Sequence, residues 1–217
     1  MIYEDRYTVV DDKMGRDYLR LCREQTIPAL RAGGGQVLCL CTGLVGEPGN
    51  AFLQMTGFAD LQAWETAQQA YHPDREEMLQ SEQVRLLRQV AYLPDGLPAR
   101  EDRRACYSYR RFFIRRASLE RFVRTSEDGV WPLYHAAGCR ILGLWTTLAA
   151  SDPMEVLLMA GYHGPGHWEE TRFFQGKPDD IDEEVWRKGR ELGAERNGLR
   201  VGSTWVRLFR SHDIEEG

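Results

Sequence analysis

The stretch Pro28–Trp64, PALRAGGGQVLCLCTGLVGEPGNAFLQMTGFADLQAW, decides the fold because its pattern returns at Pro132–Trp168, PLYHAAGCRILGLWTTLAASDPMEVLLMAGYHGPGHW. The two copies align without a gap at a shift of 132 − 28 = 104 positions. About 15 of roughly 66 aligned positions are identical, whereas average residue usage gives roughly 4 by chance. The matched residues include Pro28/Pro132, Gly34/Gly138, Leu38/Leu142, Thr42/Thr146, Met55/Met159, Gly57/Gly161 and Trp64/Trp168. The chain is therefore interpreted as an internal duplication.

Each copy predicts the end of a helix, a glycine turn, two paired strands and the start of a second helix. The glycines follow the helix because glycine readily adopts the positive φ of a helix C-terminal cap. With the strand and helix that precede it, this order is three quarters of a ferredoxin-like unit. In the first copy we expect strands at 2–10, 36–44 and 51–58, helices at 15–30, from 59 or 60, and at 74–90, and a short strand at 91–93.

The second copy predicts strands at 107–114, 140–148, 155–162 and 203–210, with helices at 119–134 and from about 179. The segment 94–104, PDGLPAREDRR, has the composition of a linker. We therefore expect a first ferredoxin-like repeat at 1–98 and a second at 105–217. Apolar side chains on both faces of the strands require both faces to be covered. The predicted class is α+β, with two antiparallel sheets packed face to face as an α/β barrel.

Composition excludes several functional classes. The net charge of −5 and the pI near 5.6 argue against nucleic acid as the main partner, because phosphate binding depends on clustered Lys and Arg. The longest apolar runs are far shorter than the ~20 residues of a membrane-spanning helix. The N-terminus lacks the pattern of a signal peptide, so we expect a cytoplasmic protein. The five cysteines form no CxxC pair, which favours buried free thiols over disulfides or a zinc site.

The segments YEDRYTVV, IPALRAGGGQV, LCLCTGLVGEPGNAFLQMTGF and DLQAW together resemble the NIPSNAP-type branch of the dimeric α/β-barrel superfamily. The second half, from YSYRRFFI through CRILGLWTTLAASDPMEVLLMAGY, is similar but looser. The resemblance implies two ferredoxin-like units and a small-molecule cleft between the sheet and the helices of each unit. It also implies a choice among cofactor-free monooxygenases, isomerases, cyclases, haem proteins and proteins without assigned activity. Association as a homodimer is a further implication.

The second copy carries histidines where the first has none: His135, His163 and His167 replace Arg31, Ala59 and Ala63. A His-x3-His spacing on one helix would suit a metal, but Gly164-Pro165-Gly166 interrupts the helix between the last two. We predict no metal site. The alternatives left open are solvated loop histidines, and general acid/base work or ligand anchoring near neutral pH.

A repeated arginine, Arg6 in the first copy and Arg110 in the second, lies in the middle of an otherwise apolar strand. Such a side chain needs water, a carboxylate or an anionic ligand. Glu65 and Glu169, which are also repeated, are the candidate intrachain partners. The alternatives are a structural ion pair and recognition of an acidic substrate.

Aromatic residues on the strands, among them Tyr7, Trp145 and Tyr162, could line a pocket for a planar ligand or belong to the core. No GxGxxG, P-loop or GxSxG motif is present, so we predict no nucleotide cofactor. The expected cofactor is none, and haem binding through one of the histidines is the alternative left open. The leading hypothesis is a cofactor-independent enzyme acting on a small hydrophobic or aromatic molecule in the cleft of the second copy. His163 and His167 would be catalytic, and Arg110, His135, Trp145, Tyr162, Arg6 and Tyr7 would bind substrate. The alternative is a non-catalytic binding or interaction module of the NIPSNAP type.

Overall fold

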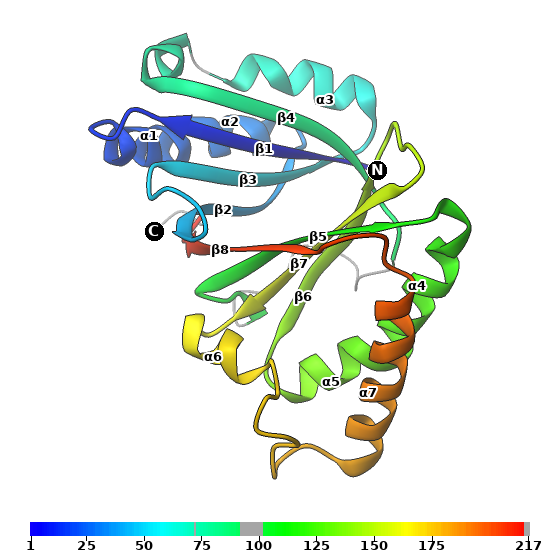
Figure 1. The fold of residues 1–217 in the computed structure, drawn as a ribbon. Helices are drawn as coiled ribbons and strands as arrows, with labels where there is room; N and C mark the ends of the chain where they lie inside the picture. The colour runs from blue at the N-terminus through cyan, green and yellow to red at the C-terminus, as the bar shows by residue number, and fades with distance from the viewer. Residues whose placement is uncertain (72, 92–101, 215–217) are drawn as a thin grey trace. The chain divides into compact units, whose positions relative to one another are not determined.

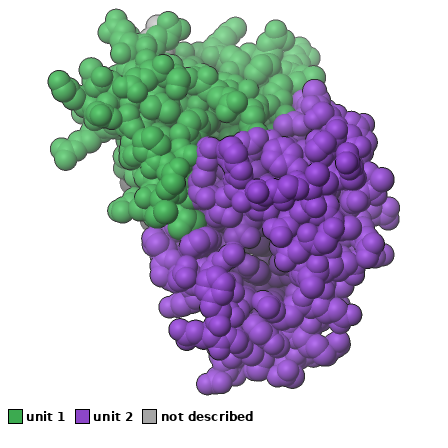
Figure 2. Space-filling model, viewed as in Figure 1, with its two compact units in different colours: residues 1–89, 95–98, 208–217 green, residues 90–94, 99–207 purple. Residues whose placement is uncertain are grey.

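The computed structural model describes residues 1–71, 73–91 and 102–214, and these form two compact units. Unit 1 comprises residues 1–89, 95–98 and 208–217, and unit 2 comprises residues 90–94 and 99–207 (Figure 2). Most of the predicted linker 94–104 and of the short strand predicted at 91–93 lies outside the described residues. Among the described residues, no helix is both long enough and apolar enough to cross a membrane.

Unit 1 has the strand order β4-β1-β3-β2, in which every neighbouring pair is antiparallel (Figure 1). This is the order of a ferredoxin-like unit. Residues 208–212 of β8 extend the sheet beyond β2. The elements of unit 1 are β1 (Ile2–Val10), α1 (Gly15–Leu21), η1 (Cys22–Thr26), α2 (Ile27–Ala32), β2 (Gln36–Val45), β3 (Ala51–Phe58), α3 (Leu61–Ala67), η2 (Gln68–Ala70), η3 (Pro73–Met78) and β4 (Leu79–Gln89).

Unit 2 repeats the arrangement, with β7 between β5 and β6 in one antiparallel sheet. Helices α4, α5 and α7 lie on one side of that sheet (Figure 1). The elements are β5 (Cys106–Ile114), η5 (Arg116–Ser118), α4 (Leu119–Thr125), η6 (Ser126–Val130), α5 (Trp131–Ala136), β6 (Arg140–Thr147), β7 (Met154–Tyr162), α6 (Pro165–Glu170) and α7 (Glu183–Gly198). Strand β8 (Trp205–His212) begins in unit 2, and its residues 208–212 belong to unit 1.

The duplication extends to backbone irregularities. In each unit a π-helical turn precedes the helix that contains the repeated proline, Pro28 or Pro132. Proline has no N–H for an intrahelical hydrogen bond, so a wider turn at this point accommodates it. Gly34 and Gly138 then adopt φ of 83° and 82°, the left-handed conformation that ends both helices. The first strand after each glycine turn has a bulge at the same repeated position, after Val37 and after Ile141.

The helix predicted over residues 74–90 is wrong, because residues 79–89 form strand β4. The segment LQSEQVRLLRQ is rich in good helix formers, yet it pairs with β1 from Leu79 to Leu87. Arg85 contacts Asp5, and Glu82 contacts Arg6, across this pairing. Tertiary pairing therefore overrides the local helix propensity here.

The main apolar clusters of both units lie between sheet and helices. In unit 1 the cluster includes Val10, Leu30 and Phe58, and in unit 2 it includes Phe112 and Phe122. All five cysteines are buried and free, as the sequence predicts. The α+β class and the two tandem ferredoxin-like repeats are confirmed.

Candidate functional site

The alternation of side chains along each strand determines which of them face the helices. Phe112 and Ile114 of β5 pack with the helices, so Ser108 and Arg110, at the same parity, face the same way. Residues directly opposite in an antiparallel pair share a face, and Arg110 is opposite Leu158 of the same cluster. The repeated arginine of unit 2 therefore points into the layer between sheet and helices.

In unit 1 the equivalent arginine is fully neutralised. Arg6 is 4% exposed and donates to both carboxylate oxygens of Glu4, at 2.7 Å and 2.9 Å. It also pairs with Glu82, which in turn pairs with Arg75. Glu4, rather than the predicted Glu65, is thus the main partner of Arg6 in the structure.

The network around Glu4 leaves few free hydrogen-bonding positions. Trp64, Tyr71 and Gln68 donate to the Glu4 carboxylate at 2.7 Å, 2.8 Å and 3.1 Å. Burial by itself raises the pKa of Glu4, but the hydrogen bonds and charge of Arg6, assisted by Trp64 and Tyr71, hold it below its usual value. Two carboxylates face two guanidiniums, so the helix-facing interior of unit 1 is balanced in charge.

Unit 2 lacks this balance because Ser108 occupies the position of Glu4. Among the described residues, the Arg110 side chain has no hydrogen-bond or salt-bridge partner, and its buried Nε is unsatisfied. Five buried donors of this kind belong to the layer between sheet and helices of unit 2. They are Ser108 Oγ, Arg110 Nε, Trp131 Nε1, Thr146 Oγ1 and Arg196 Nε. Buried polar groups normally have partners, so a cluster of unsatisfied donors calls for an explanation.

Arg196 is a member of this group that the sequence analysis missed. It is 6% exposed, and its guanidinium carbon lies 5.4 Å from the ring centre of Phe112 and 5.5 Å from that of Phe122. Its one hydrogen bond to a described residue is a long one of 3.4 Å to Ser126 Oγ. Arg196 follows Val185 by 11 positions and Leu192 by 4. This helical spacing is the signal that places residue 196 on the buried stripe of α7.

The pKa of Arg196 is lowered to about 10, chiefly by burial and in addition by the nearby cations Arg110 and Arg200, against the opposing effect of Tyr134 and Tyr162. At neutral pH the guanidinium is still charged. Unit 2 therefore contains two cations at the inner layer, without a carboxylate within 4 Å among the described residues. Figure 2 shows unit 2 hollowed near its middle.

Tyr162 connects this layer to the histidines. It is 1% exposed and packs with Cys139 and Ala160, next to Tyr134. Burial raises its pKa well above the usual value and the nearby Tyr134 adds to the rise, while the charge of Arg110 opposes it. Its ring also meets the ring of His167 edge-on at 5.9 Å.

His163 and His167 lie together at the end of β7, with ring centres 4.8 Å apart. The backbone N–H of His163 donates to Nδ1 of His167 at 3.1 Å, so Nε2 of His167 carries the proton that it donates to the carbonyl of Ala137 at 2.6 Å. His167 thereby joins α6 to the end of α5. His163 is exposed, and its pKa is lowered by residual burial, then by Arg104, His167 and Arg140.

The remaining predicted residues lie apart from this group. Trp145 is fully buried opposite Leu157, on the face of the sheet turned away from the helices. Tyr7 likewise points away from the helices of unit 1, and its hydroxyl contacts Glu47. His135 lies in the last turn of α5, where burial and Arg140 lower its pKa. Tyr162 therefore lies on the same face of the sheet as Arg110 and contacts His167, which lies beside His163, whereas Tyr7, Trp145 and Arg6 lie elsewhere.

A surface pocket of about 510 Å³ lies beside the histidines in unit 2. Its walls come from α6 and the segment that leads to α7, and include His167, Phe173, Phe174 and Lys177. The ring of Phe173 contacts that of Tyr134 at 6.0 Å. Among the described residues, no group of three or more His, Cys, Asp or Glu is arranged to hold a metal ion.

The comparisons with known proteins agree on the fold. No family model and no curated protein matches the chain. A solved structure of a candidate monooxygenase from Lactobacillus acidophilus NCFM aligns with a TM-score of 0.66 and 11% identity, over 97% of this chain and 93% of that one. An anthrone oxidase-like protein aligns with a TM-score of 0.62 and 12% identity, over 98% and 91%. The chain therefore shares its α+β fold with these structures.

Solved NIPSNAP family proteins also match, over about half of the chain. One from Agrobacterium tumefaciens is 23% identical, with a TM-score of 0.37, over 46% of this chain and 98% of its own length.

Proposed function

We propose that this protein is an enzyme without a nucleotide cofactor, of the monooxygenase, isomerase or cyclase type, which acts on a small hydrophobic or aromatic molecule. The reaction would take place in the layer between sheet and helices of unit 2. The observation that carries the proposal is the contrast between the units: the neutralised Arg6 network in unit 1 and the unsatisfied donors around Arg110 in unit 2. An active site tolerates unsatisfied polar groups because the substrate completes them.

The residues present suit chemistry that begins with proton transfer. Arg110 would stabilise negative charge that develops on a substrate oxygen, as a preorganised donor does. The Tyr162 phenol, with its raised pKa, stays protonated and can donate a hydrogen bond to the same oxygen. His163, which is exposed and close to His167, is the candidate that exchanges the proton with solvent.

Both full-length structural neighbours described above carry oxygenase-type names, which supports testing oxidation first. The test is to incubate the full-length chain with anthrone in air and to follow quinone formation by absorbance. Native mass spectrometry of the purified protein would reveal a co-purified small molecule. We expect turnover that falls at least tenfold in Arg110→Met.

The matched control is Arg111→Met, because Arg111 lies next to Arg110 but points to the other face of β5 and pairs with Glu155 at 2.6 Å. This control should keep the wild-type rate. An unchanged rate of turnover in both Arg110→Met and His163→Ala would contradict the assignment of the site. Binding of a small molecule without turnover of any oxidation, isomerisation or cyclisation substrate would favour a binding module. Homodimer formation and a cytoplasmic location stay predictions from the sequence.

A further inference from the structure

We infer that the interior of unit 2 binds a carboxylate between the guanidiniums of Arg110 on β5 and Arg196 on α7. The inference rests on the proposed function for the place of the ligand, and adds the chemical class of the substrate: an aromatic or otherwise apolar carboxylic acid. It also assigns a binding role to Arg196.

The two arginines approach the same space from opposite layers. Arg110 and Phe112 are two residues apart on the same face of β5, which separates their Cα atoms by about 6.6 Å. The guanidinium of Arg196 stacks on the Phe112 ring at 5.4 Å. Arg196 therefore lies over the strand segment that carries Arg110, with the sheet below and α7 above.

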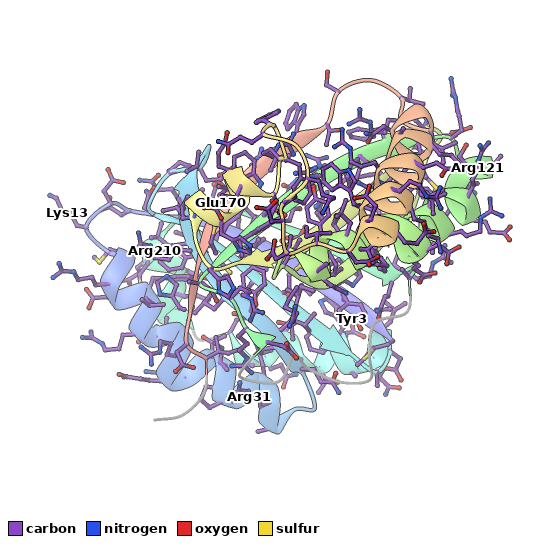
Figure 3. All side chains as sticks on the ribbon, turned by 90° about the horizontal axis from the view of Figure 1, so that it is seen from below. Tyr3, Lys13, Arg31, Arg121, Glu170 and Arg210 are labelled. Atoms are coloured by element: carbon purple, nitrogen blue, oxygen red, sulfur yellow. The ribbon has the colours of Figure 1, made fainter. Side chains whose placement is uncertain are left out.

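Close packing holds α7 in this position. A Cβ atom at Gly189 would come within 2.6 Å of Leu133, and one at Gly129 within 2.7 Å of Leu192, so glycine allows the backbones of α7, α5 and η6 to approach. On the outer surface, Arg121 of α4, labelled in Figure 3, pairs with Glu195 at 2.5 Å. Glu195 points outward while its neighbour Arg196 is turned into the interior, where the fixed helix presents it.

The ligand must supply acceptors and negative charge. All five unsatisfied groups of this layer can donate, and the arginine and tryptophan nitrogens can only donate. A buried cation, Arg196, beside a half-buried one, Arg110, is costly without a carboxylate unless an anion joins them. Unit 1 shows how this fold meets that need with its own chain, since Glu4, two residues before Arg6 on the same strand, accepts its hydrogen bonds. At Ser108 this carboxylate is missing, and a ligand carboxylate takes its place.

A carboxylate fits the surroundings better than a phosphate. The planar guanidinium fork matches a carboxylate in a bidentate arrangement. The side chains packed around these donors are largely apolar, with Phe112, Phe122 and Trp131 in one core cluster. Such a lining favours a singly charged group attached to an aromatic body, because a phosphate dianion loses more hydration energy on entry.

The experiment compares 2-naphthoate with its uncharged isostere 2-naphthamide and with inorganic phosphate, using isothermal titration and thermal unfolding of the full chain. We expect 2-naphthoate to bind and to raise Tm with concentration, and the amide and phosphate to do neither at the same concentrations. Equal binding of amide and acid would overturn the inference. Binding of phosphate without binding of the acid would also overturn it, and would indicate a phosphoryl ligand.

The variants are Arg196→Leu and Arg196→Lys, with Arg190→Leu as the matched control. Arg190 lies on the same helix and stacks on Trp186 at 5.3 Å, but it is exposed. We expect Arg196→Leu to lose 2-naphthoate affinity at least tenfold, Arg196→Lys to keep part of it, and Arg190→Leu to keep all of it.

The Tm of the unliganded protein separates binding from structure. Removal of an unpaired buried charge should leave the Tm of Arg196→Leu unchanged or raise it, whereas a purely structural arginine would lower it. An Arg196→Leu variant that binds 2-naphthoate as tightly as wild type would refute the carboxylate clamp. Binding of 2-naphthoate without any turnover would contradict the proposed enzymatic function but would support the carboxylate clamp. Turnover of uncharged substrates alone would support the enzymatic function and contradict the carboxylate clamp.

Discussion

Glu4 accepts two hydrogen bonds from Arg6 across the surface of one strand, and the pair is buried, with Glu4 fully inaccessible and Arg6 4% exposed. The two residues are at positions i and i+2, so they share the helix-facing side of β1. The same spacing in unit 2 joins Ser108 to Arg110. One substitution between the copies therefore separates a closed network, in which the arginine is paired with a carboxylate, from an open one, in which it is not.

The first prediction concerns the stability of unit 1. Glu4→Gln removes the charge that neutralises Arg6 and leaves part of the network without its acceptor. Breaking a buried pair from one side costs about 3 to 5 kcal/mol, so urea unfolding should show a loss of that order. Ser108→Ala, its counterpart in unit 2, removes an unsatisfied hydroxyl and should change stability by less than about 1 kcal/mol. Equal losses in the two variants would contradict the contrast between the units.

Much of the fold is readable from the sequence because its signals are local and occur twice. Gly34 and Gly138 end helices in the left-handed conformation, and Pro28 and Pro132 mark the irregular turns. Strand β4 was missed because its residues prefer a helix in isolation, and only the pairing with β1 makes them a strand.

The site was only partly predictable. The repeat identifies Arg110 as the counterpart of Arg6. That Arg110 lacks a carboxylate partner follows only when Ser108 is compared with Glu4, the residue at the same position of the first copy. Arg196 has no counterpart to compare, because α7 occurs in the second copy alone. Its inward direction depends on the packing of α7 over the sheet, a relation between residues about 85 positions apart that no local pattern encodes.

A second prediction separates the two neighbouring histidines. His167→Ala removes the hydrogen bond from α6 to Ala137 at the end of α5 and the one that His167 accepts from the backbone N–H of His163, so it should cost about 1 to 2 kcal/mol in urea unfolding. His163→Ala removes an exposed ring whose backbone N–H, not its side chain, makes the bond, and should leave stability within about 0.5 kcal/mol of wild type. A larger loss in His163→Ala than in His167→Ala would show that the assigned tautomer and bonding are incorrect.

The third prediction is a loss of stability at mildly acid pH. Burial lowers the pKa of His135 and His212, and Arg140 and Arg210, respectively, lower them further. The unfolded chain then binds protons more readily than the folded one, so unfolding becomes easier as the pH falls through about 6.5. The free energy of unfolding should be flat from pH 8 to 7.5 and fall toward pH 5.5.

His212→Gln tests this pH dependence, because His212 contacts Thr42 at 2.9 Å and is partly buried. Between pH 8 and 5.5 the free energy of unfolding should fall less in the variant than in wild type. The difference should be up to about 1.4 kcal/mol for each pH unit by which folding lowers the pKa of His212. Stability that rises on acidification would refute the cause assigned to the shifts.

The last prediction converts the open network into the closed one. Ser108→Glu restores in unit 2 the carboxylate that Glu4 provides in unit 1, at the same spacing from the arginine. The new side chain should pair with Arg110, raise the Tm of the unliganded protein, and abolish both turnover and 2-naphthoate binding because it occupies the ligand's place. Ser108→Gln, of nearly equal size and without charge, is the control: it should reduce binding less and should not raise Tm. If Ser108→Glu still binds 2-naphthoate as wild type does, the carboxylate does not lie beside Arg110.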